Sequence, residues 1–254
     1  MSDQFGGRIA LVTGAGRGIG RAMARQLAAQ GAVVALVARS SDELAETARQ
    51  VVADGGRAVV VPADLADADQ RVEAVRHARE ACGEVDILVN NAGVVEPLGP
   101  SATVDPAEWA AAIGLNLTAA ATLTFALLPA MLEQKWGRVV NVSSGVAASP
   151  GFLVGGNAYT TAKAALEAHT VNLAAELAGT GVTVNVYRPG TVDTSMQAWI
   201  RRRDPEQIGA APHEYFAQMH ARGRLLTPEV SARSMVARLA GEATGQIWDV
   251  ADPI

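Results

Sequence analysis

The chain has 254 residues, of which 49% are hydrophobic and 19% are charged, so a large apolar core is expected and wholesale disorder is excluded. The net charge of −5 and the 4% aromatic content exclude a basic, aromatic-lined surface for nucleic acid, and the charge gives no attraction to anionic lipid. A length near 250 residues fits one α/β domain, and we assign residues 1–254 to one.

The N-terminal residues are polar and lead directly into the first apolar run, so no secretory signal is predicted. The longest apolar stretch, Leu117–Leu132, is shorter than the roughly 20 residues that a membrane span requires. The one cysteine, Cys82, excludes an internal disulfide and fits a reducing compartment. We therefore expect a cytoplasmic protein.

Short apolar runs alternate with longer helical patterns along the chain. The runs are Ile9–Val12, Val33–Val37, Ala58–Val61, Ile87–Val89, Val139–Val142 and Val182–Val186, with a weaker final strand at Gln246–Val250. Apolar runs without alternation are typical of parallel strands that helices cover on both faces. The order predicts an α/β fold with a single doubly wound, mostly parallel sheet of the Rossmann type and helices on both faces.

A glycine-rich loop, Thr13–Gly20, follows the first strand directly and opens a helix. Glycines permit the tight turn, and a helix N-terminus offers free N–H groups and partial positive charge to a pyrophosphate. This strand–turn–helix context favours a dinucleotide site over a purely structural turn.

The end of the second strand predicts which dinucleotide binds. An NAD enzyme of this fold places an acidic residue there to bind the ribose 2′-hydroxyl, but the position holds Ala38 and Arg39 follows it. Arg17 in the glycine loop is expected close by. Two arginines without a carboxylate suit a 2′-phosphate, so we predict NADP(H). The next helix is expected to begin at Ser40, because Ser40 and Glu43 have the spacing of a capping box.

Tyr159 and Lys163 lie four residues apart in an Ala-rich helical segment and therefore share one helix face. A lysine ammonium beside the tyrosine, together with a positive nicotinamide ring, is expected to lower the pKa of the phenol. Such a tyrosine can give a proton to a carbonyl oxygen or take one from an alcohol. A pair at this spacing also arises by chance, so other motifs must support it.

Those motifs occur in order along the chain. They are the glycine loop, Asn90–Gly93 after the fourth strand, Asn116, Ser143–Ser144 after the fifth strand, Tyr159 with Lys163, and Pro189–Gly190 after the sixth strand. Together they resemble the short-chain dehydrogenase/reductase family over essentially the whole chain. The resemblance implies reversible hydride transfer between a nicotinamide cofactor and a carbonyl or secondary alcohol, with ketone or diketone reduction as the expected direction.

The resemblance also implies a role for each catalytic residue. Tyr159 is the expected acid/base, and Lys163 is expected to hold the nicotinamide ribose and lower the tyrosine pKa. Ser144 is expected to bind the substrate oxygen, while neighbouring Ser143 satisfies the strand end. Asn116 is expected to anchor a water that links Lys163 to solvent, although a buried asparagine bonded only to backbone is the alternative.

The cofactor contacts that the resemblance implies are spread along the chain. They are Gly14, Arg17, Gly18, Ile19, Gly20, Arg39, Asp64, Leu65, Asn91, Ala92, Gly93, Tyr159, Lys163, Pro189, Gly190, Val192 and Thr194. Asp64 and Leu65 match the adenine contact, but Asp64 could instead cap the next helix. Val192 and Thr194 would hold the carboxamide. The four histidines have no metal-ligand spacing, so no metal is expected.

Two segments depart from the family pattern. The loop Val146–Gly156 makes the Ser144–Tyr159 interval two residues longer than usual. The segment from about residue 195 to 227 is more polar than the rest and is expected to form a substrate lid of one or two short helices over the crevice. Its arginine triplet, residues 201–203, is interpreted as a solvated helix face.

The C-terminal part is similar to the sepiapterin reductase branch, which also reduces diketones, and Asp249 matches the pterin-anchoring aspartate of that branch. The helices around Leu117–Leu132 and after Tyr159 are apolar enough to predict a homodimer or homotetramer, as the family forms through these helices. An epimerase or enoyl reductase on a related fold fits the glycine and Tyr159–Lys163 spacings poorly. A non-catalytic NADP-binding regulator remains the alternative function.

Overall fold

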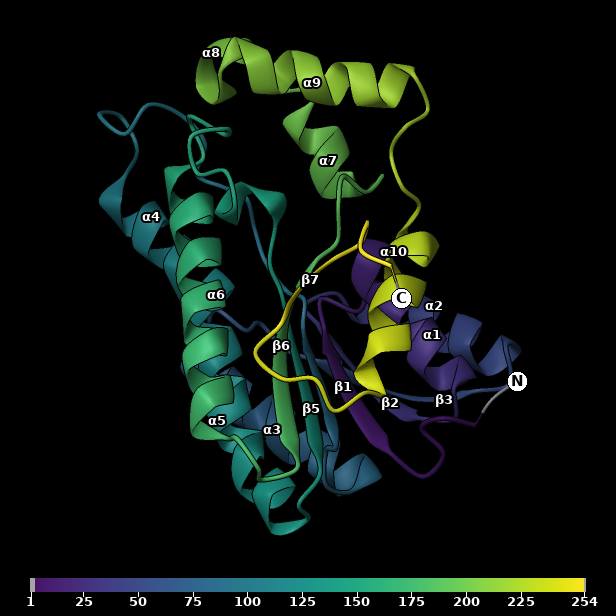
Figure 1. Ribbon diagram of the computed structural model, residues 1–254. Helices are drawn as coiled ribbons and strands as arrows, with labels where there is room; N and C mark the ends of the chain where they lie inside the picture. The colour runs from purple at the N-terminus through teal and green to yellow at the C-terminus, as the bar shows by residue number, and fades with distance from the viewer. Residues whose placement is uncertain (1–2, 254) are drawn as a thin grey trace.

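The computed structural model describes residues 3–253 and contains one seven-stranded sheet within that range (Figure 1). The predicted boundaries at residues 1 and 254 lie outside it. The strands are β1 Ile9–Thr13, β2 Val33–Ala38, β3 Arg57–Pro62, β4 Ile87–Asn90, β5 Gly137–Val142, β6 Val182–Arg188 and β7 Ile247–Asp249. Their order is β3-β2-β1-β4-β5-β6-β7, and every neighbouring pair is parallel. The predicted doubly wound fold is confirmed.

Helices cover both faces of this sheet (Figure 1). They are α1 Gly18–Ala29, α2 Ser41–Ala53, α3 Ala68–Cys82, α4 Pro106–Ile113, α5 Ala119–Glu133, α6 Asn157–Glu176, α7 Ser195–Ile200, α8 Pro205–Ile208, α9 Ala210–Ala221 and α10 Pro228–Leu239. A π-helical segment, Gly114–Thr118, joins α4 to α5, and a short 3₁₀ turn, Gly145–Ala147, follows β5.

Alternate residues of each strand supply two separate cores. Ala10 and Val12 of β1 pack with side chains of α1, α2 and α10 on one face. Leu11 packs with side chains of α3, α5 and α6 on the other face. Both faces of the central strands are therefore buried, which is why these strands read as continuous apolar runs.

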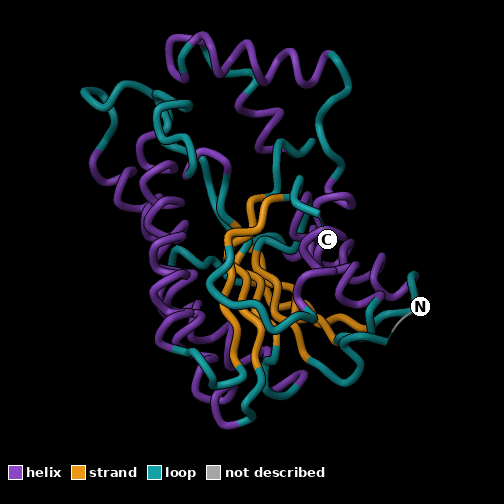
Figure 2. Tube along the Cα trace, viewed as in Figure 1, coloured by secondary structure: helices purple, strands orange, loops and turns teal. Residues whose placement is uncertain are grey.

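Several strands extend past their apolar runs into polar residues. β1 ends with Thr13, β4 with Asn90 and β6 with Arg188, all one or two residues beyond the predicted limits. These residues lie at the carboxyl edge of the sheet, where the loops gather (Figure 2). The polar side chains at the strand ends therefore lie together at the carboxyl edge of the sheet.

The apolar stretch Leu117–Leu132 belongs to a longer helix than the sequence predicted. Pro106–Glu133 is continuously helical over 28 residues, which is long and apolar enough, by length and composition alone, to cross a membrane. In the fold α5 packs against α3 and β5, and Leu123, Leu127 and Met131 are buried there. The stretch therefore serves as a core helix of the sheet.

The segment after β6 forms three helices, α7, α8 and α9, rather than one or two. They lie beyond the carboxyl edge, at the top of Figure 1. The two ends of the segment are joined, because Val192 pairs with Leu226 and the Asp193 N–H donates to the Leu226 carbonyl at 2.9 Å. These contacts hold the two ends of the segment together, and we call residues 195–227 the covering segment.

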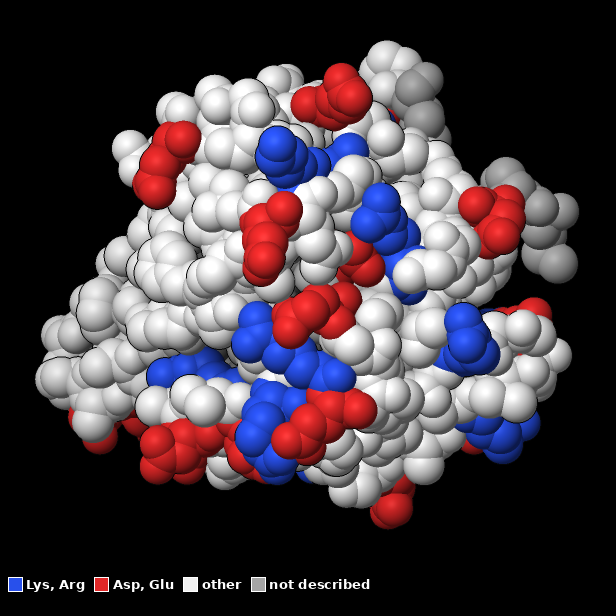
Figure 3. Space-filling view, turned by 90° about the horizontal axis from the view of Figure 1, so that it is seen from below, with Lys and Arg blue, Asp and Glu red and all other residues white. Residues whose placement is uncertain are grey.

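Charged side chains of both signs are interspersed on the lower face of the molecule (Figure 3). Elsewhere on α2, Arg49 pairs with Glu46 at 2.7 Å. A surface of this kind produces no extended field of one sign on this face.

Candidate active site

The glycine loop turns sharply between β1 and α1. Gly14 and Gly18 have φ values of +65° and +55°, a region that favours glycine. A Cβ on Gly20 would lie 2.2 Å from the Gly14 carbonyl oxygen, so only glycine fits where α1 crosses the loop. No side chain caps the N-terminus of α1, which begins after Arg17 with no acidic residue in its first turn. Its free N–H groups form a ready anion site.

Asn91 holds this loop in place. Its side-chain amide donates to the Thr13 carbonyl at 2.9 Å, and the N–H groups of Asn91 and Ala92 both donate to the Thr13 hydroxyl at 2.9 Å. The residues after β4 are therefore bonded to the end of β1, beside it in the sheet. Asn91 lines the cavity, but its amide group is occupied in supporting the loop.

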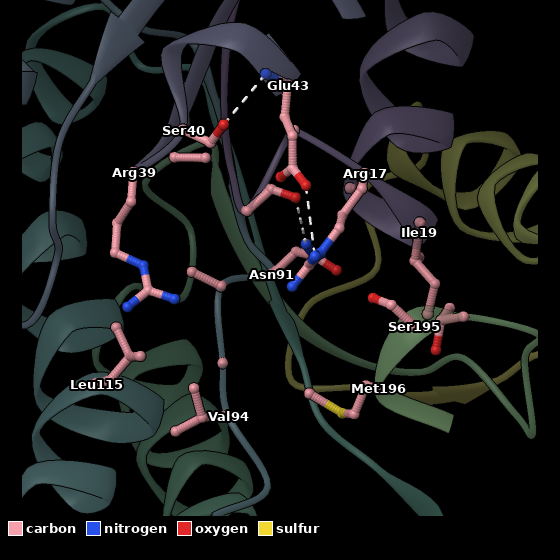
Figure 4. Close-up of a pocket in the computed structure, with 18 of the residues that line it drawn as sticks. Arg17, Ile19, Arg39, Ser40, Glu43, Asn91, Val94, Leu115, Ser195 and Met196 are labelled. Carbon is pink, nitrogen blue, oxygen red and sulfur yellow. Dashed lines mark hydrogen bonds and ion pairs between the residues drawn. The ribbon is translucent and has the colours of Figure 1, made fainter. Parts of the chain in front are cut away.

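One cavity of about 650 Å³ opens over this edge (Figure 4). Among the predicted cofactor contacts it is lined by Gly14, Arg17, Gly18, Ile19, Gly20, Arg39, Asp64, Leu65, Asn91, Ala92, Gly93 and Thr194. Its wall does not include Tyr159, Lys163, Pro189, Gly190 or Val192. The predicted contacts thus divide into those that line this cavity and those at the same sheet edge that lie outside its wall.

Other residues of the cavity wall were not among the predicted cofactor contacts. They are Gly16, Ala38, Ser40, Glu43, Ala63, Val94, Val95, Glu96, Leu115, Ser195, Met196, Trp199 and Arg202. Most follow a strand or belong to the segment after β6. Glu43 is the one with a recognisable signal, because the Ser40–Glu43 spacing placed it in the first turn of α2.

That capping box is only half formed. The Glu43 N–H donates to the Ser40 hydroxyl at 3.2 Å, which caps α2 as predicted. The Glu43 carboxylate does not return to Ser40 but pairs with the Arg17 guanidinium at 3.3 Å (Figure 4). Arg39 extends into the same cavity, and no partner for it is found in the described part of the chain.

Asp64 is not the cap of α3. That role belongs to Asp67, whose carboxylate accepts from the N–H groups of Asp69 and Gln70. Asp64 instead accepts from the Ala66 N–H at 3.0 Å in a local turn, with its side chain on the cavity wall. The alternative that Asp64 caps the next helix is therefore wrong, and its position beside Leu65 remains available for a cofactor contact.

Tyr159 and Lys163 share one face of α6, as predicted. The Lys163 ammonium lies 5.8 Å from the centre of the Tyr159 ring and donates to the Val142 carbonyl at 2.8 Å. Burial lowers the pKa of Lys163 to about 8. Burial also raises the pKa of Tyr159, and the neighbouring Ser144 hydroxyl opposes that shift only in part. Among the protein's own groups, burial thus outweighs the lowering expected from Lys163.

The two serines after β5 have different surroundings. Ser143 is 2% exposed and donates to the Glu167 carboxylate at 2.7 Å. Ser144 faces Tyr159 and accepts the Val146 N–H at 3.4 Å, which begins the short turn after β5. Only Ser144 is placed where a substrate oxygen next to the Tyr159 hydroxyl could reach it.

Asn116 lies in the π-helical segment between α4 and α5 and is 1% exposed. Its amide donates to the Val94 carbonyl at 2.8 Å, and its carbonyl accepts the Val94 N–H at 3.0 Å. A Cβ on Gly93 would lie 2.6 Å from the Asn116 Oδ1 atom and 3.6 Å from the Lys163 ammonium, so glycine leaves open the space between these two groups. Single π turns often mark functional sites.

A buried ion pair that the sequence analysis missed joins α6 to the sheet. Glu167, one turn after Lys163, is 8% exposed and accepts from Arg188 at 2.9 and 2.6 Å. Arg188 ends β6 immediately before Pro189. The pair, completed by Ser143, fixes α6 against the ends of β5 and β6. Two charged groups 21 positions apart give no local sequence signal.

The residues after β6 lead from the sheet to α7. Pro189 is buried, Gly190 has a φ of +76°, and Val192 is 5% exposed. Thr194 caps α7 by accepting the Gln197 N–H at 3.2 Å. A Cβ on Gly18 would lie 3.4 Å from the Thr194 methyl group. The start of α7 therefore lies directly against the glycine loop.

An apolar cluster covers Tyr159. Val95, Val146 and Leu153 pack there with Ile200 of α7, and the partly buried Met196 and Trp199 complete the cover. The arginine triplet is not a solvated face, because Arg202 lines the cavity and the Arg203 guanidinium stacks over Trp199 at 4.1 Å. The segment after β6 thus contacts both the cavity and the tyrosine.

Asp249 lies away from this centre. Asp249 accepts the Ala251 N–H at 3.0 Å in a C-terminal turn and lines neither this cavity nor the adjacent one of about 500 Å³ beside α4. Within residues 3–253 no group of three His, Cys, Asp or Glu side chains could hold a metal ion.

Comparison with known proteins agrees with this arrangement. Residues 8–205 match the family model described as short chain dehydrogenase. The ketoacyl reductase HetN of Nostoc sp. is 40% identical over 199 residues, which cover 76% of this chain and 68% of that protein. A variant of actinorhodin polyketide ketoreductase with NADPH superimposes with a TM-score of 0.86 at 34% identity, covering 98% of this chain and 97% of that one. NAD+-bound xylitol dehydrogenase gives 0.85 at 26% identity, covering 96% and 98%.

Replacing Glu167 with glutamine should destabilise the fold. The variant leaves the largely buried Arg188 guanidinium without its carboxylate, which costs about 3–5 kcal/mol in comparable buried pairs. Urea unfolding at one fixed protein concentration measures the loss. The matched control is Asp54→Asn, which breaks the exposed pair with Arg25 and should cost at most about 1 kcal/mol. Equal losses in the two variants would contradict the anchoring role of Glu167.

Proposed function

The chain belongs to the short-chain dehydrogenase/reductase family, and we propose that it is an NADP(H)-dependent carbonyl reductase acting through Tyr159. The observation that carries the proposal is the placement of Ser144, Tyr159 and Lys163 together at the sheet edge that also bears the glycine loop. The bound nicotinamide supplies the hydride in reduction and accepts it in the reverse reaction.

The chain's own groups fit such a cofactor. The uncapped N-terminus of α1 and the glycines that a Cβ would obstruct suit a pyrophosphate. Arg17 and Arg39 line the same cavity and suit a 2′-phosphate, which guanidinium groups bind with charge-assisted hydrogen bonds. Asp64 and Leu65 would contact the adenine. Val192 and Thr194, where α7 meets the glycine loop, would hold the carboxamide.

The protonation state of Tyr159 suits the role of proton donor in reduction. Burial raises the pKa of Tyr159, so the neutral phenol is the resting form, and the neutral phenol is the form that donates a proton to a carbonyl oxygen. Ser144 would hold that oxygen from the other side. Lys163 would bind the nicotinamide ribose with its ammonium, and a water held at Asn116, near Gly93, would return a proton to the Lys163 side of the site.

The covering segment around residues 195–227 would act as the substrate lid. Its apolar contacts around Tyr159 suit a carbonyl with apolar flanks. The sepiapterin reductase branch stays a prediction of the sequence, and Asp249 would have to move out of its C-terminal turn to anchor a pterin. A panel of ketones, diketones including benzil, quinones and sepiapterin, followed by NADPH absorbance, tests the substrate class.

Tyr159→Phe should abolish turnover while leaving cofactor binding intact. The substitution removes the proton donor and keeps the ring that packs under the covering segment. We expect the rate to fall by at least about 100-fold, the size usual for a lost general acid. NADPH fluorescence titration should give a dissociation constant within about twofold of the wild type. A variant that reduces the best substrate at the wild-type rate would refute the role of Tyr159.

Cofactor binding should weaken as the pH rises past about 8, because Lys163 titrates there and its ammonium is the form that would hold the ribose. Because burial lowers the Lys163 pKa to about 8, the ammonium predominates below pH 8 and is lost progressively as the pH rises above it. NADPH titrations across this range measure the effect. Lys163→Arg keeps the charge at every accessible pH, so its affinity should stay flat. If the dissociation constant of Lys163→Arg for NADPH still rises near pH 8, a group other than Lys163 causes the titration.

We also propose a homo-oligomer assembled through α5 and α6. Phe125 is 54% exposed and Val171 is 43% exposed on these helices, and the Phe125 ring packs edge-on against His169. Light scattering should give a dimer or tetramer mass. Phe125→Glu should shift the mass toward the monomer, because burying the new charge is costly. A wild-type mass equal to one chain would refute the assembly.

A further inference from the structure

The strongest unassigned feature of the cofactor cavity is the carboxylate of Glu43. Glu43 lies on the cavity wall at the end where Arg17 and Arg39 would bind the 2′-phosphate (Figure 4). One oxygen of its carboxylate is 3.3 Å from the Arg17 guanidinium. A phosphate that Arg17 contacts directly would therefore lie beside a negative charge.

The position of Glu43 is fixed from several directions. Its N–H is held by the Ser40 hydroxyl, and its carbonyl accepts from Thr47 at 3.0 Å. The same Thr47 hydroxyl lies 3.0 Å from the Ala15 carbonyl oxygen and can share its single proton with it, which ties the first turn of α2 to the glycine loop. A Cβ on Gly16 would lie 3.0 Å from the Glu43 side chain. The carboxylate is thus held against the loop that carries Arg17.

The charges at this end of the cavity therefore do not amount to a simple phosphate site. Arg39 has no partner in the described residues, while Arg17 is shared with Glu43 and the Ser40 hydroxyl is used as the cap of α2. Two guanidinium groups and one carboxylate leave a net charge of about +1 for a phosphate that carries about −1.5 to −2.

We propose that Glu43 is a specificity-determining residue that limits the preference for NADP(H) over NAD(H) by holding Arg17. NADPH must displace the Glu43 carboxylate from Arg17 and accept it as a neighbour, whereas NADH carries no charge at this end and is not opposed. The inference rests on the proposed NADP(H) function. It adds that one acidic residue outside the second-strand end makes the ratio of NADPH affinity to NADH affinity smaller than Arg17 and Arg39 alone would give.

The test compares cofactor affinities of Glu43→Gln and the wild type by fluorescence titration with NADPH and NADH. Glutamine keeps the size of the side chain and removes its charge. Two unit charges about 4 Å apart that stay in contact with water interact by an amount that corresponds to about 3- to 10-fold in affinity. NADPH should therefore bind about 3- to 10-fold more tightly to the variant, and NADH should change by less than about twofold.

Glu46→Gln is the matched control. Glu46 lies one turn later on α2, is also half-buried and pairs with Arg49, but it does not line the cavity. It removes the same charge, so it should leave both dissociation constants within about twofold of the wild type. A shift in the control equal to that of Glu43→Gln would reduce the effect to net charge and overturn the proposal.

Two further variants separate the possible failures. In an Arg17→Ala background the gain from Glu43→Gln should shrink, and an equal gain there would overturn the role of Arg17. Arg39→Asp should weaken NADPH and favour NADH, which checks that the 2′ end lies where proposed. If the wild type binds NADPH and Arg39→Asp weakens it, an unchanged Glu43→Gln overturns this inference alone. If the wild type does not bind NADPH, the proposed function fails with it.

Discussion

Every strand of the sheet runs parallel to its neighbours, so each strand delivers its last residue to the same edge. Thr13, Ser143 and Arg188 end or follow their strands there, and their hydrogen bonds cross from one strand end to the next element. The glycine loop is held through Thr13, and α6 is held through Ser143 and Arg188. The cavity over the sheet edge and the placement of Tyr159 therefore depend on one constraint, the common direction of the strands.

The sequence predicted the strands well because burial on both sheet faces leaves a signal in the chain itself. It also predicted the cap at Ser40 and the glycine turns, which are local. It could not predict the Glu167–Arg188 pair, since two charged residues 21 positions apart resemble ordinary surface residues until the fold brings them together. Asn91 was recognised by position, but its support of the glycine loop depends on the neighbouring strand. Residues whose role depends on a contact with another strand or helix produce no periodic pattern in the sequence.

The titrating groups show a related limit. The spacing of Tyr159 and Lys163 correctly places both on one helix face, and from charge alone it predicts a lowered tyrosine pKa. In the folded chain both groups are desolvated, which raises the pKa of the tyrosine and lowers that of the lysine. Burial disfavours the charged form of each group. Sequence reports which groups meet, whereas the packing of the covering segment determines how strongly water is excluded.

The same physics connects helix capping to cofactor choice. A capping box would have directed the Glu43 carboxylate back to the start of α2, and the sequence spacing allows this. The glycine loop lies so close to α2 that the Glu43 carboxylate pairs with the Arg17 guanidinium instead of the Ser40 backbone N–H. The Ser40 hydroxyl still accepts the Glu43 N–H, so α2 keeps its N-terminal cap. The Glu43 carboxylate adds a negative charge to the cavity wall. A residue with a local structural role in the sequence thus becomes, through one tertiary contact, part of the cavity wall that we propose distinguishes a phosphate from a hydroxyl.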